Sequence, residues 1–407
     1  MHMTRANKAF PLSGGFSVIE LIIAMALFAI VIVSASNIFI PVIGQSKQQS
    51  RITETQMEGI IGLDILRRDI EGAGYGIPWN AIGADDTDGD GNVWEHLPNY
   101  AEALSDTSAT VDPSLYNDAT RDADGDGLIG EAPRGILSGD NLGINNSDYL
   151  VIKSVSVASS SVNDAAHKWT SILTGNEPKE WNNLDEDIND NDLVTVMRPV
   201  ASGDRFKELI VANAGGGLSF FTAFSQTAFP PEFSPFQPNE NFLIFGVSST
   251  ADSLRMPFNR ADYFIGPGAP ARCAPNTGVL FKAALNHDSA AAPGSNGRLA
   301  VPAQAILDCV ADFQVVYGLD TDGDQAIDTQ QDDVSGMEAE VIRAQVKNVS
   351  VFILAHEGQV DTYYTYDGPD DVALGNSLIK LSDTAGADWD HYRWKIYTLI
   401  LKTENLE

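Results

Sequence analysis

The sequence is poor in basic residues, histidine and cysteine. Its 407 residues include 25 Lys+Arg against 56 Asp+Glu, a formal net charge of −31, and only six histidines and two cysteines. This excess of negative charge excludes nucleic acid and anionic lipid headgroups as partners of most of the chain. With so few imidazole and thiolate ligands, a transition-metal centre is not expected. Because 43% of the residues are hydrophobic, the acidity does not indicate a disordered chain.

Motifs of common enzyme classes are also absent from the sequence. It contains no Gly-x-Ser-x-Gly nucleophile motif, no Gly-x-x-x-x-Gly-Lys-Ser/Thr phosphate loop and no His-Glu-x-x-His zinc motif. The histidines are scattered, and no pair of acidic residues stands out as a glycosidase pair. We therefore expect no enzymatic activity.

Charge is nearly absent from one long stretch near the N-terminus. Between Phe16 and Ile43 the only charged residue is Glu20. This run of about 28 residues spans roughly 42 Å as a helix, which is enough to cross a bilayer. Arg5 and Lys8 precede it, and positive charge ahead of an apolar segment keeps that end in the cytoplasm. The sequence therefore predicts one membrane-spanning helix, with nearly all of the remaining chain outside.

Glu20 needs a partner in such a helix, because an unpaired charge inside a membrane is costly. If the chain is cut between Gly15 and Phe16, the new amino group lies about one helical turn from Glu20. The Glu20 carboxylate can then pair with this amine or with the amine of a neighbouring subunit. Either pairing lowers the cost of burying the charge.

Gly15, Phe16 and Glu20 resemble the hallmark of the type IV pilin and pseudopilin superfamily, in which a short basic leader ends in glycine and glutamate is the fifth mature residue. The resemblance implies cleavage after Gly15 and N-methylation of Phe16 by a prepilin peptidase. It also implies storage in the inner membrane and packing of the helix in a filament core, where Glu20 serves assembly. Two alternatives remain: an ordinary membrane anchor, which has no need of Glu20, and a secretory signal cleaved after Ser34-Ala35-Ser36.

Residues 45–76 predict an amphipathic continuation of this helix. Apolar residues between positions 52 and 70 recur largely at steps of three and four, with charged residues between them. The glycines from Gly72 to Gly76 suit a helix end and a turn. The segment 63–76 resembles the end of the long helix in PilW-type minor pilins, where an Arg-Asp pair precedes an Ala-Gly-Tyr turn.

We predict an α+β fold, in which the long N-terminal helix is followed by a large, mainly antiparallel β pilin-like head with long loops. Residues 77–146 are rich in Gly, Asp, Asn and Pro, so we expect loops there. Apolar runs and alternation predict strands at 148–155, 193–197, 208–211, 242–245, 279–283, 311–319, 346–354 and 394–401. The expected segments are a leader peptide (1–15), a membrane and filament helix (16–44), its amphipathic continuation (45–76), a loop-rich region (77–146) and a β-rich head (147–407).

Three acidic runs share one pattern, with aspartates at every second position. Such spacing places carboxylates on one side of a tight loop, and a glycine after the third aspartate permits the sharp bend; the third run lacks this glycine. A hard cation with six to eight oxygen ligands fits a loop of this kind. None of the three matches a full EF-hand loop, because the twelfth position holds no glutamate. The candidate calcium ligands are Asp86, Asp88, Asp90 and Glu95 in the first loop, Asp122, Asp124, Asp126 and Glu131 in the second, and Asp320, Asp322, Asp324 and Asp328 in the third.

We expect a structural calcium site in at least one of these loops, with the weak to moderate affinity of extracellular modules. The alternative is a solvated acidic turn. Since the loop-rich region has little apolar material to bury, calcium binding would supply free energy that orders it.

Cys273 and Cys309 fall in the part of the chain that would face an oxidising compartment. A single disulfide between them is therefore favoured, and two buried free thiols are the alternative.

Both ends of the chain resemble PilW-like minor pilins, since the C-terminal third adds a strand, an aspartate loop and a further strand. The resemblance implies a single-pass inner-membrane protein with a periplasmic head that later joins an extracellular type IV pilus. There it would prime assembly in a tip complex and support adhesion or motility. Its partners would be other minor and major pilins, the prepilin peptidase and a tip adhesin. Two other functions stay open: a type II secretion pseudopilin, and a calcium-dependent surface adhesin displayed by the pilin route.

Overall fold

A computed structural model describes residues 17–84, 89–160, 163–200, 207–213, 217–287, 297–300 and 302–406. Gly15 and Phe16 of the expected cleavage site lie outside the described residues, as do Asp86 and Asp88 of the first acidic loop. The chain divides into two compact units, residues 1–53 and 54–407. Helix α1 (Val18–Glu71) begins in the first unit and ends in the second.

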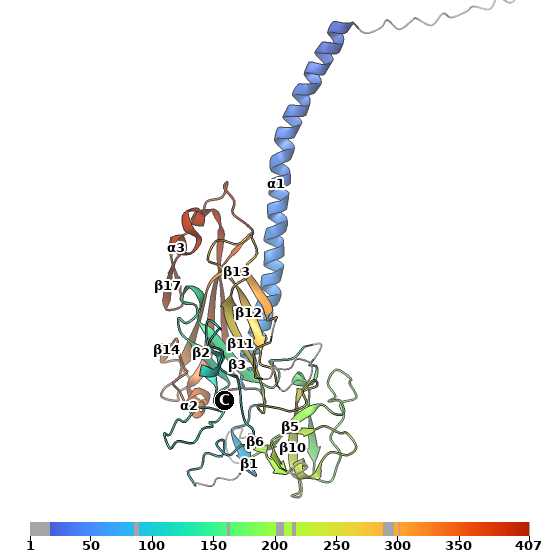
Figure 1. The fold of residues 1–407 in the computed structure, drawn as a ribbon, viewed down its shortest axis with the longest axis vertical. Helices are drawn as coiled ribbons and strands as arrows, with labels where there is room; N and C mark the ends of the chain where they lie inside the picture. Colours follow the sequence, from blue (N-terminus) through green and yellow to red (C-terminus); the bar gives the residue numbers. More distant parts are fainter. Residues whose placement is uncertain are drawn as a thin grey trace, which may run out of the picture. The chain divides into compact units, whose positions relative to one another are not determined.

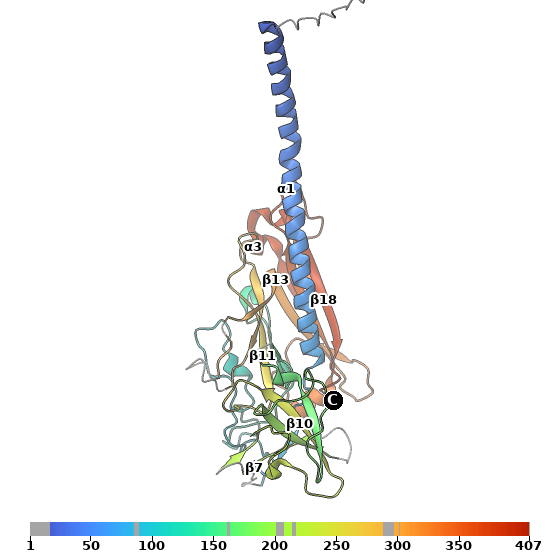
Figure 2. The ribbon, with the colours of Figure 1, turned by 90° about the vertical axis from the view of Figure 1, so that its right-hand side faces the viewer.

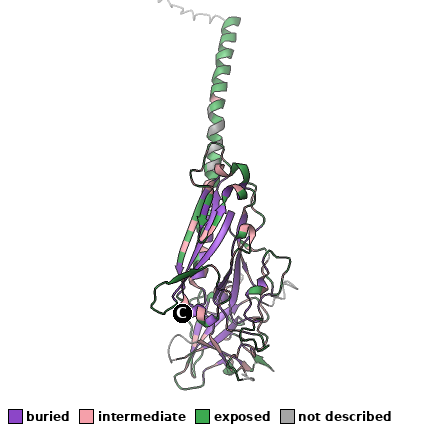
Figure 3. Cartoon of the chain, turned by 90° about the vertical axis from the view of Figure 1, so that its left-hand side faces the viewer, coloured by how far each residue is buried: buried purple, intermediate pink, exposed green. Residues whose placement is uncertain are grey.

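The first unit contains the N-terminal part of α1, a helix of 54 residues in all (Figure 1). Residues Val18–Asn37 are long and apolar enough to cross a membrane. The side chains of Val18, Ile22 and Phe28 are 60–76% exposed, and Figure 3 shows this part of the helix as exposed along its length. Because water is a poor environment for so much apolar surface, this part of α1 requires lipid or other helices around it.

The last turn of α1 belongs to the second unit and is bound there at several points. Asp69 accepts a hydrogen bond from the Tyr263 hydroxyl (2.5 Å) and pairs with the ammonium group of Lys282 (2.5 Å). Asn405 donates its side-chain amide to the carbonyl oxygen of Glu71 (2.8 Å). The end of the helix is therefore held by two strands and by the C-terminal segment.

The larger sheet of the second unit has eight strands, each antiparallel to its neighbours. Leu66 and Ile70 of α1 are buried in the same core as Leu307 of this sheet, and Figure 2 shows the C-terminal part of α1, which belongs to the second unit, beside it. Gly62 comes so close that a Cβ there would lie 1.9 Å from the Ile306 carbonyl oxygen. The strands in spatial order are β18 (Arg393–Lys402), β15 (Val346–Glu357), β13 (Gln304–Leu319), β12 (Gly278–Ala284), β11 (Asn259–Gly266), β3 (Tyr149–Ser154) and β2 (Ile136–Gly139), with β14 (Thr329–Gln331) paired to β13.

The smaller sheet has six strands, of which β1 and β6 are parallel and the other pairs antiparallel. Val155, Met197 and Phe245 form a small apolar cluster that joins the end of β3 to this sheet. The strands are β1 (Asn80–Ile82), β6 (Lys207–Ile210), β5 (Leu193–Pro199), β10 (Asn241–Ser248) and, at the edge, β4 (Trp169–Leu173), with β9 (Thr222–Ala223) paired to β5.

Short elements complete the second unit. They are the pairs β7 (Ala212–Asn213) with β8 (Leu218–Ser219) and β16 (Asp371–Leu374) with β17 (Ser377–Lys380), helices α2 (Ala339–Gln345) and α3 (Leu381–Ala385), and the 3-10 helices η1 (Pro113–Tyr116), η2 (Ile144–Asn146), η3 (Ala165–His167), η4 (Pro231–Phe233) and η5 (Gly386–His391). Within the described part of residues 77–146, regular structure is limited to β1, β2, η1 and η2.

The structure confirms the predicted α+β class, with a long N-terminal helix and a large, mostly antiparallel β domain. Each segment predicted as a strand overlaps an observed strand, and α1 ends at Glu71, just before the predicted glycine turn. The sequence prediction missed β4 and β11. It also missed the short strands of two to four residues, which are β1, β2, β7, β8, β9, β14, β16 and β17.

Two buried carboxyl groups lie at β13: Asp312 is part of this strand, and Asp148, which precedes β3, contacts its backbone. Asp148 accepts backbone hydrogen bonds from Asn141 (3.0 Å) and Val315 (2.7 Å). Burial raises the pKa of Asp148 to about 7, and burial likewise raises the pKa of Asp312 to about 6. In the folded protein both groups therefore favour the protonated form at pH values where they would ionise in the unfolded chain.

We expect Asp148 to make the head less stable as the pH rises. Its contribution is fully present below its ordinary pKa of 3.8 and is lost as the pH rises through about 7. Urea unfolding should show that the free energy of unfolding of the wild type declines from pH 4 to pH 8. In Asp148→Asn this decline should be smaller by about 2–4 kcal/mol. Asp383→Asn, at an exposed position in α3, should keep the wild-type slope. Identical pH profiles for Asp148→Asn and the wild type would contradict this assignment.

Candidate functional site

The start of α1 is closed by a reciprocal pair of hydrogen bonds. The Glu20 carboxylate accepts the backbone N–H of Ser17 (2.9 Å), and the Ser17 hydroxyl accepts the backbone N–H of Glu20 (3.3 Å). This is the capping box expected for serine followed by glutamate three residues later. Glu20 thus has a role within its own chain that the sequence analysis did not identify: it satisfies a donor at the start of α1.

The second acidic loop folds around its own carboxylates. Asp122 accepts the backbone N–H groups of Gly125 (2.7 Å) and Gly127 (3.2 Å) through its two oxygens. The Asp126 carboxylate accepts the backbone N–H of Leu128 (2.7 Å). The Asp124 carboxylate accepts the backbone N–H of Asp126 (3.2 Å). Each aspartate is therefore fixed by the backbone that follows it, which leaves its remaining lone pairs available to a ligand.

The third loop repeats this pattern. Asp320 accepts the N–H groups of Gly323 (2.6 Å) and Gln325 (2.9 Å), at the same spacing as in the second loop. Gln325 stands where the second loop has Gly127, and both residues have positive φ, +71° and +95°. The missing glycine therefore does not prevent the bend, although glutamine adopts this conformation at a steric cost.

Carboxylates of the first and second loops meet in one cluster. Asp90, Glu95, Asp124 and Asp126 each offer an oxygen within 4.8 Å of the others. The side-chain amide of Asn92 joins the two loops by donating to Glu95 (2.7 Å) and to the carbonyl of Gly130 (2.9 Å). In the sequence these loops are separate runs, and only their folding brings the four carboxylates into one cluster.

A second cluster is formed by Asp320, Asp322 and Asp328 of the third loop, whose carboxylate oxygens also lie within 4.8 Å of one another. Among the predicted ligands that the structure describes, Asp122, Glu131 and Asp324 lie outside both clusters. All ligand atoms offered by the two clusters are carboxylate oxygens, which suits a hard cation such as Ca²⁺ rather than a soft transition metal.

A network of buried ions ties the loop-rich region to the larger sheet. The ammonium group of Lys153 contacts Glu102 (2.7 Å) and Asp118 (2.6 Å), and Arg134 contacts Asp118 (2.6 Å). Although burial opposes its ionisation, Lys153 and Arg134 hold the pKa of Asp118 below its ordinary value. Three cations balance three anions, all almost fully buried: Glu102, Asp118 and Arg134 from the loop-rich region, Lys153 of β3, and Arg260 and Asp262 of β11.

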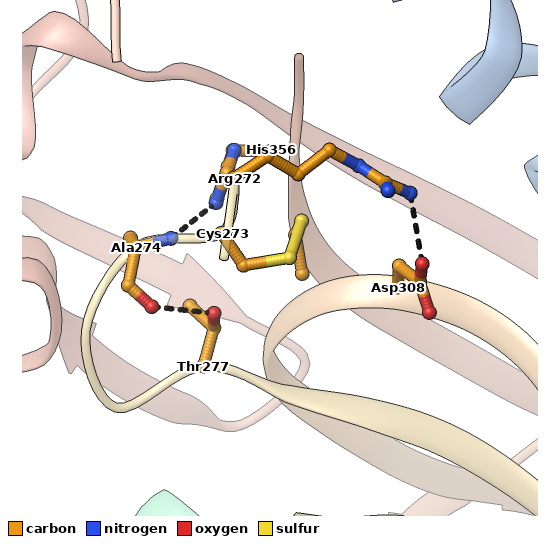
Figure 4. The surroundings of a disulfide bond; sticks show 7 residues. Arg272, Cys273, Ala274, Thr277, Asp308 and His356 are labelled. Atoms are coloured by element: carbon orange, nitrogen blue, oxygen red, sulfur yellow. Dashed lines mark hydrogen bonds and ion pairs between the residues drawn. A yellow bond between two sulfur atoms is a disulfide. The ribbon is translucent and has the colours of Figure 1, made fainter. Parts of the chain in front are cut away.

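Cys273 and Cys309 form a disulfide that joins the segment before β12 to β13 (Figure 4). Beside it, the ring of His356 accepts the backbone N–H of Ala274 (2.8 Å) through Nε2. Burial lowers the pKa of His356 to about 3, so the imidazole is neutral. Arg272 pairs with Asp308 (2.8 Å) on the other side of the bond. The disulfide therefore lies among fixed polar contacts, with Cys309 buried and Cys273 half-buried.

No protein-family model matches the chain, and no curated protein does. Among solved structures, this chain is similar to a type IV-like pilin from Thermus thermophilus, with 16% sequence identity and a TM-score of 0.19. The match covers 54% of this chain and 87% of the pilin chain.

Proposed function

We propose that this chain is a filament subunit of the pilin type, with a PilW-like minor pilin as the specific form. The observation that carries the proposal is the apolar span Val18–Asn37 of α1, which is exposed and whose only charge, Glu20, stands near its start. A helix that is apolar around its whole circumference must be surrounded by lipid or by other helices. In the proposed cycle it is first held in the inner membrane and then packs among pilin helices in an extracellular filament.

Glu20 has two tasks in this proposal. Before assembly, its bond to the Ser17 N–H partly offsets the cost of keeping a carboxylate in an apolar segment. During assembly, it pairs with the free amine at Phe16 of a neighbouring subunit, which aligns the two helices. The large head favours a place at the filament tip, where the subunit would join other minor pilins and prime assembly.

The test is the mass and N-terminal sequence of the protein recovered from bacterial membranes that contain a prepilin peptidase. We expect a chain that begins at N-methylated Phe16. A chain that begins at Asn37 would mean ordinary secretion, and an intact Met1 would mean a simple membrane anchor; either result overturns the proposal.

A pair of variants separates the two tasks of Glu20. Glu20→Gln keeps an acceptor for the Ser17 N–H but removes the charge, so we expect cleavage at Phe16 with loss of the subunit from sheared filaments. Ser17→Ala removes the hydroxyl but keeps the charge, and should leave incorporation close to wild type. Equal incorporation of Glu20→Gln and wild type would show that charge pairing does not align the helices.

We further propose that calcium binds the acidic loops and has a structural role. The cluster of Asp90, Glu95, Asp124 and Asp126 supports this, because without a cation four carboxylates repel one another at these distances. A cation there would join the first loop to the second and so order the loop-rich region.

Removal of calcium is expected to loosen residues 77–146 before the C-terminal strands β13, β15 and β18. Limited proteolysis with and without a chelator should show faster cleavage in this region, with added Ca²⁺ restoring protection. Asp124→Asn should weaken the effect of calcium there, whereas Asp322→Asn should leave it unchanged. Equal protease sensitivity with and without chelator would exclude a structural role for calcium.

A further inference from the structure

A cavity of about 330 Å³ opens at the edge of the smaller sheet, and none of its lining residues comes from the helix α1 or the acidic loops. Its walls are His167, Lys168, Trp169, Trp181 and Glu186. Trp169 is the first residue of β4, the edge strand, and is 38% exposed. A tryptophan that folding leaves so exposed in a cavity retains apolar surface that a ligand can cover.

The two indoles are fixed in place before any ligand arrives. Trp181 donates its ring N–H to the backbone carbonyl of Trp169 (2.8 Å), and the ring centroids lie 5.0 Å apart at an angle of 59°. The turn after Trp181 is held by Asp187, which accepts the backbone N–H groups of Trp181 (2.7 Å) and Asn183 (3.0 Å). Walls that do not have to be ordered on binding lower the entropic cost of binding.

The polar groups of the cavity are positioned in the same way. Lys168 pairs with Asp164 (3.2 Å), and the ring of His167 bonds to the Ser159 hydroxyl (3.1 Å) and the Asp185 carbonyl (3.2 Å). Glu186 adds an exposed carboxylate to the wall. One ammonium and one carboxylate balance, so the lining offers both donors and acceptors without a net formal charge.

We infer that this cavity binds one hexose ring of a neutral glycan. A hexose has apolar C–H groups that cover an indole face and hydroxyls that both donate and accept hydrogen bonds, which matches two tryptophans beside charges of both signs. The volume is at the small end of ligand cavities and admits one ring rather than a peptide segment.

A cationic ligand fits less well. The ammonium group of Lys179 already lies 4.0 Å from the centre of the Trp181 ring, so this indole already has a cation as its partner. The glycan site would give the head a binding function that does not depend on cleavage at Phe16, so it can fail while the filament proposal stands, and the reverse.

The experiment measures tryptophan fluorescence of the full chain in detergent micelles during titration with three neutral tetrasaccharides. These are β-linked glucose, α-linked glucose and β-linked N-acetylglucosamine tetramers, with tetramethylammonium as the cationic probe. We expect at least one tetrasaccharide to bind, and Trp169→Ala to weaken it at least about tenfold. Leu184→Ala, a highly exposed position in the neighbouring loop, serves as the matched control and should bind as the wild type does.

Because indole fluorescence itself changes in Trp169→Ala, isothermal calorimetry on the same samples supplies the affinity. Loss of binding in Trp169→Ala but not in Leu184→Ala supports the inference. It is overturned if none of the tetrasaccharides binds, if Trp169→Ala binds with wild-type affinity, or if tetramethylammonium binds in their place.

Discussion

Replacing Lys153 by methionine is expected to lower the free energy of unfolding of the head by about 3–5 kcal/mol. Methionine fills the space of the lysine stem, but it leaves Glu102 and Asp118 without the ammonium group that contacts both of them. Neither carboxylate can reach water, since both side chains are fully buried. The loss appears as a lower midpoint in urea unfolding followed by near-UV circular dichroism.

The matched control for this variant is Lys395→Met. Lys395 also pairs with a glutamate, Glu357 (3.0 Å), but its side chain is 47% exposed, so we expect a loss below about 1 kcal/mol. A double variant that also carries Glu102→Gln should regain part of the stability, because it leaves two buried cations with two buried anions, Arg134 with Asp118 and Arg260 with Asp262. Equal losses in Lys153→Met and Lys395→Met would show that burial of the network adds nothing to stability.

Gly62→Ala is expected to destabilise the packing of α1 on the larger sheet by about 2–3 kcal/mol. Its new methyl group would lie 1.9 Å from the carbonyl oxygen of Ile306, and a backbone atom of a central strand cannot move aside as a flexible side chain does. The gain in helix propensity from glycine to alanine, about 1 kcal/mol, opposes this loss without cancelling it.

Gly59→Ala provides the control on the same face of the same helix. A Cβ at Gly59 would meet Leu307 at 3.4 Å and the Tyr397 hydroxyl at 3.6 Å, which is ordinary contact. We therefore expect Gly59→Ala to be neutral or to stabilise by up to about 1 kcal/mol. Thermal unfolding of the two variants in parallel measures the difference, and a Gly62→Ala variant as stable as Gly59→Ala would contradict the close approach.

The strands that the sequence predicts are those whose apolar residues show the pattern directly, such as β13 and β15. Strand β11 escaped prediction because Arg260 and Asp262 interrupt its pattern. Both are fully buried, and their charges are balanced by each other and by Glu102, 158 residues away from Arg260. When the partner of a buried charged residue is distant in the sequence, the local pattern does not distinguish that residue from an exposed one.

The acidic loops show a similar limit. Asp122 and Asp320 hold the backbone three and five residues ahead in the same way, and this local geometry follows from the aspartate spacing. The contact of Asp90 with Asp124 and Asp126 does not follow from any local pattern, because it depends on how the chain between the two loops folds. Spacing predicts a loop, and tertiary packing decides which loops share a site.

The attachment of α1 determines how tension would enter the head if the helix is pulled. Asp69 is bound to Tyr263 of β11 and Lys282 of β12, while Glu71 is bound to Asn405 at the other end of the chain. These contacts lie within three residues of one another along the helix, so a pulling force loads them together rather than one after another. The force is therefore distributed over two adjacent strands and the C-terminal segment, and these contacts must break together before α1 can detach.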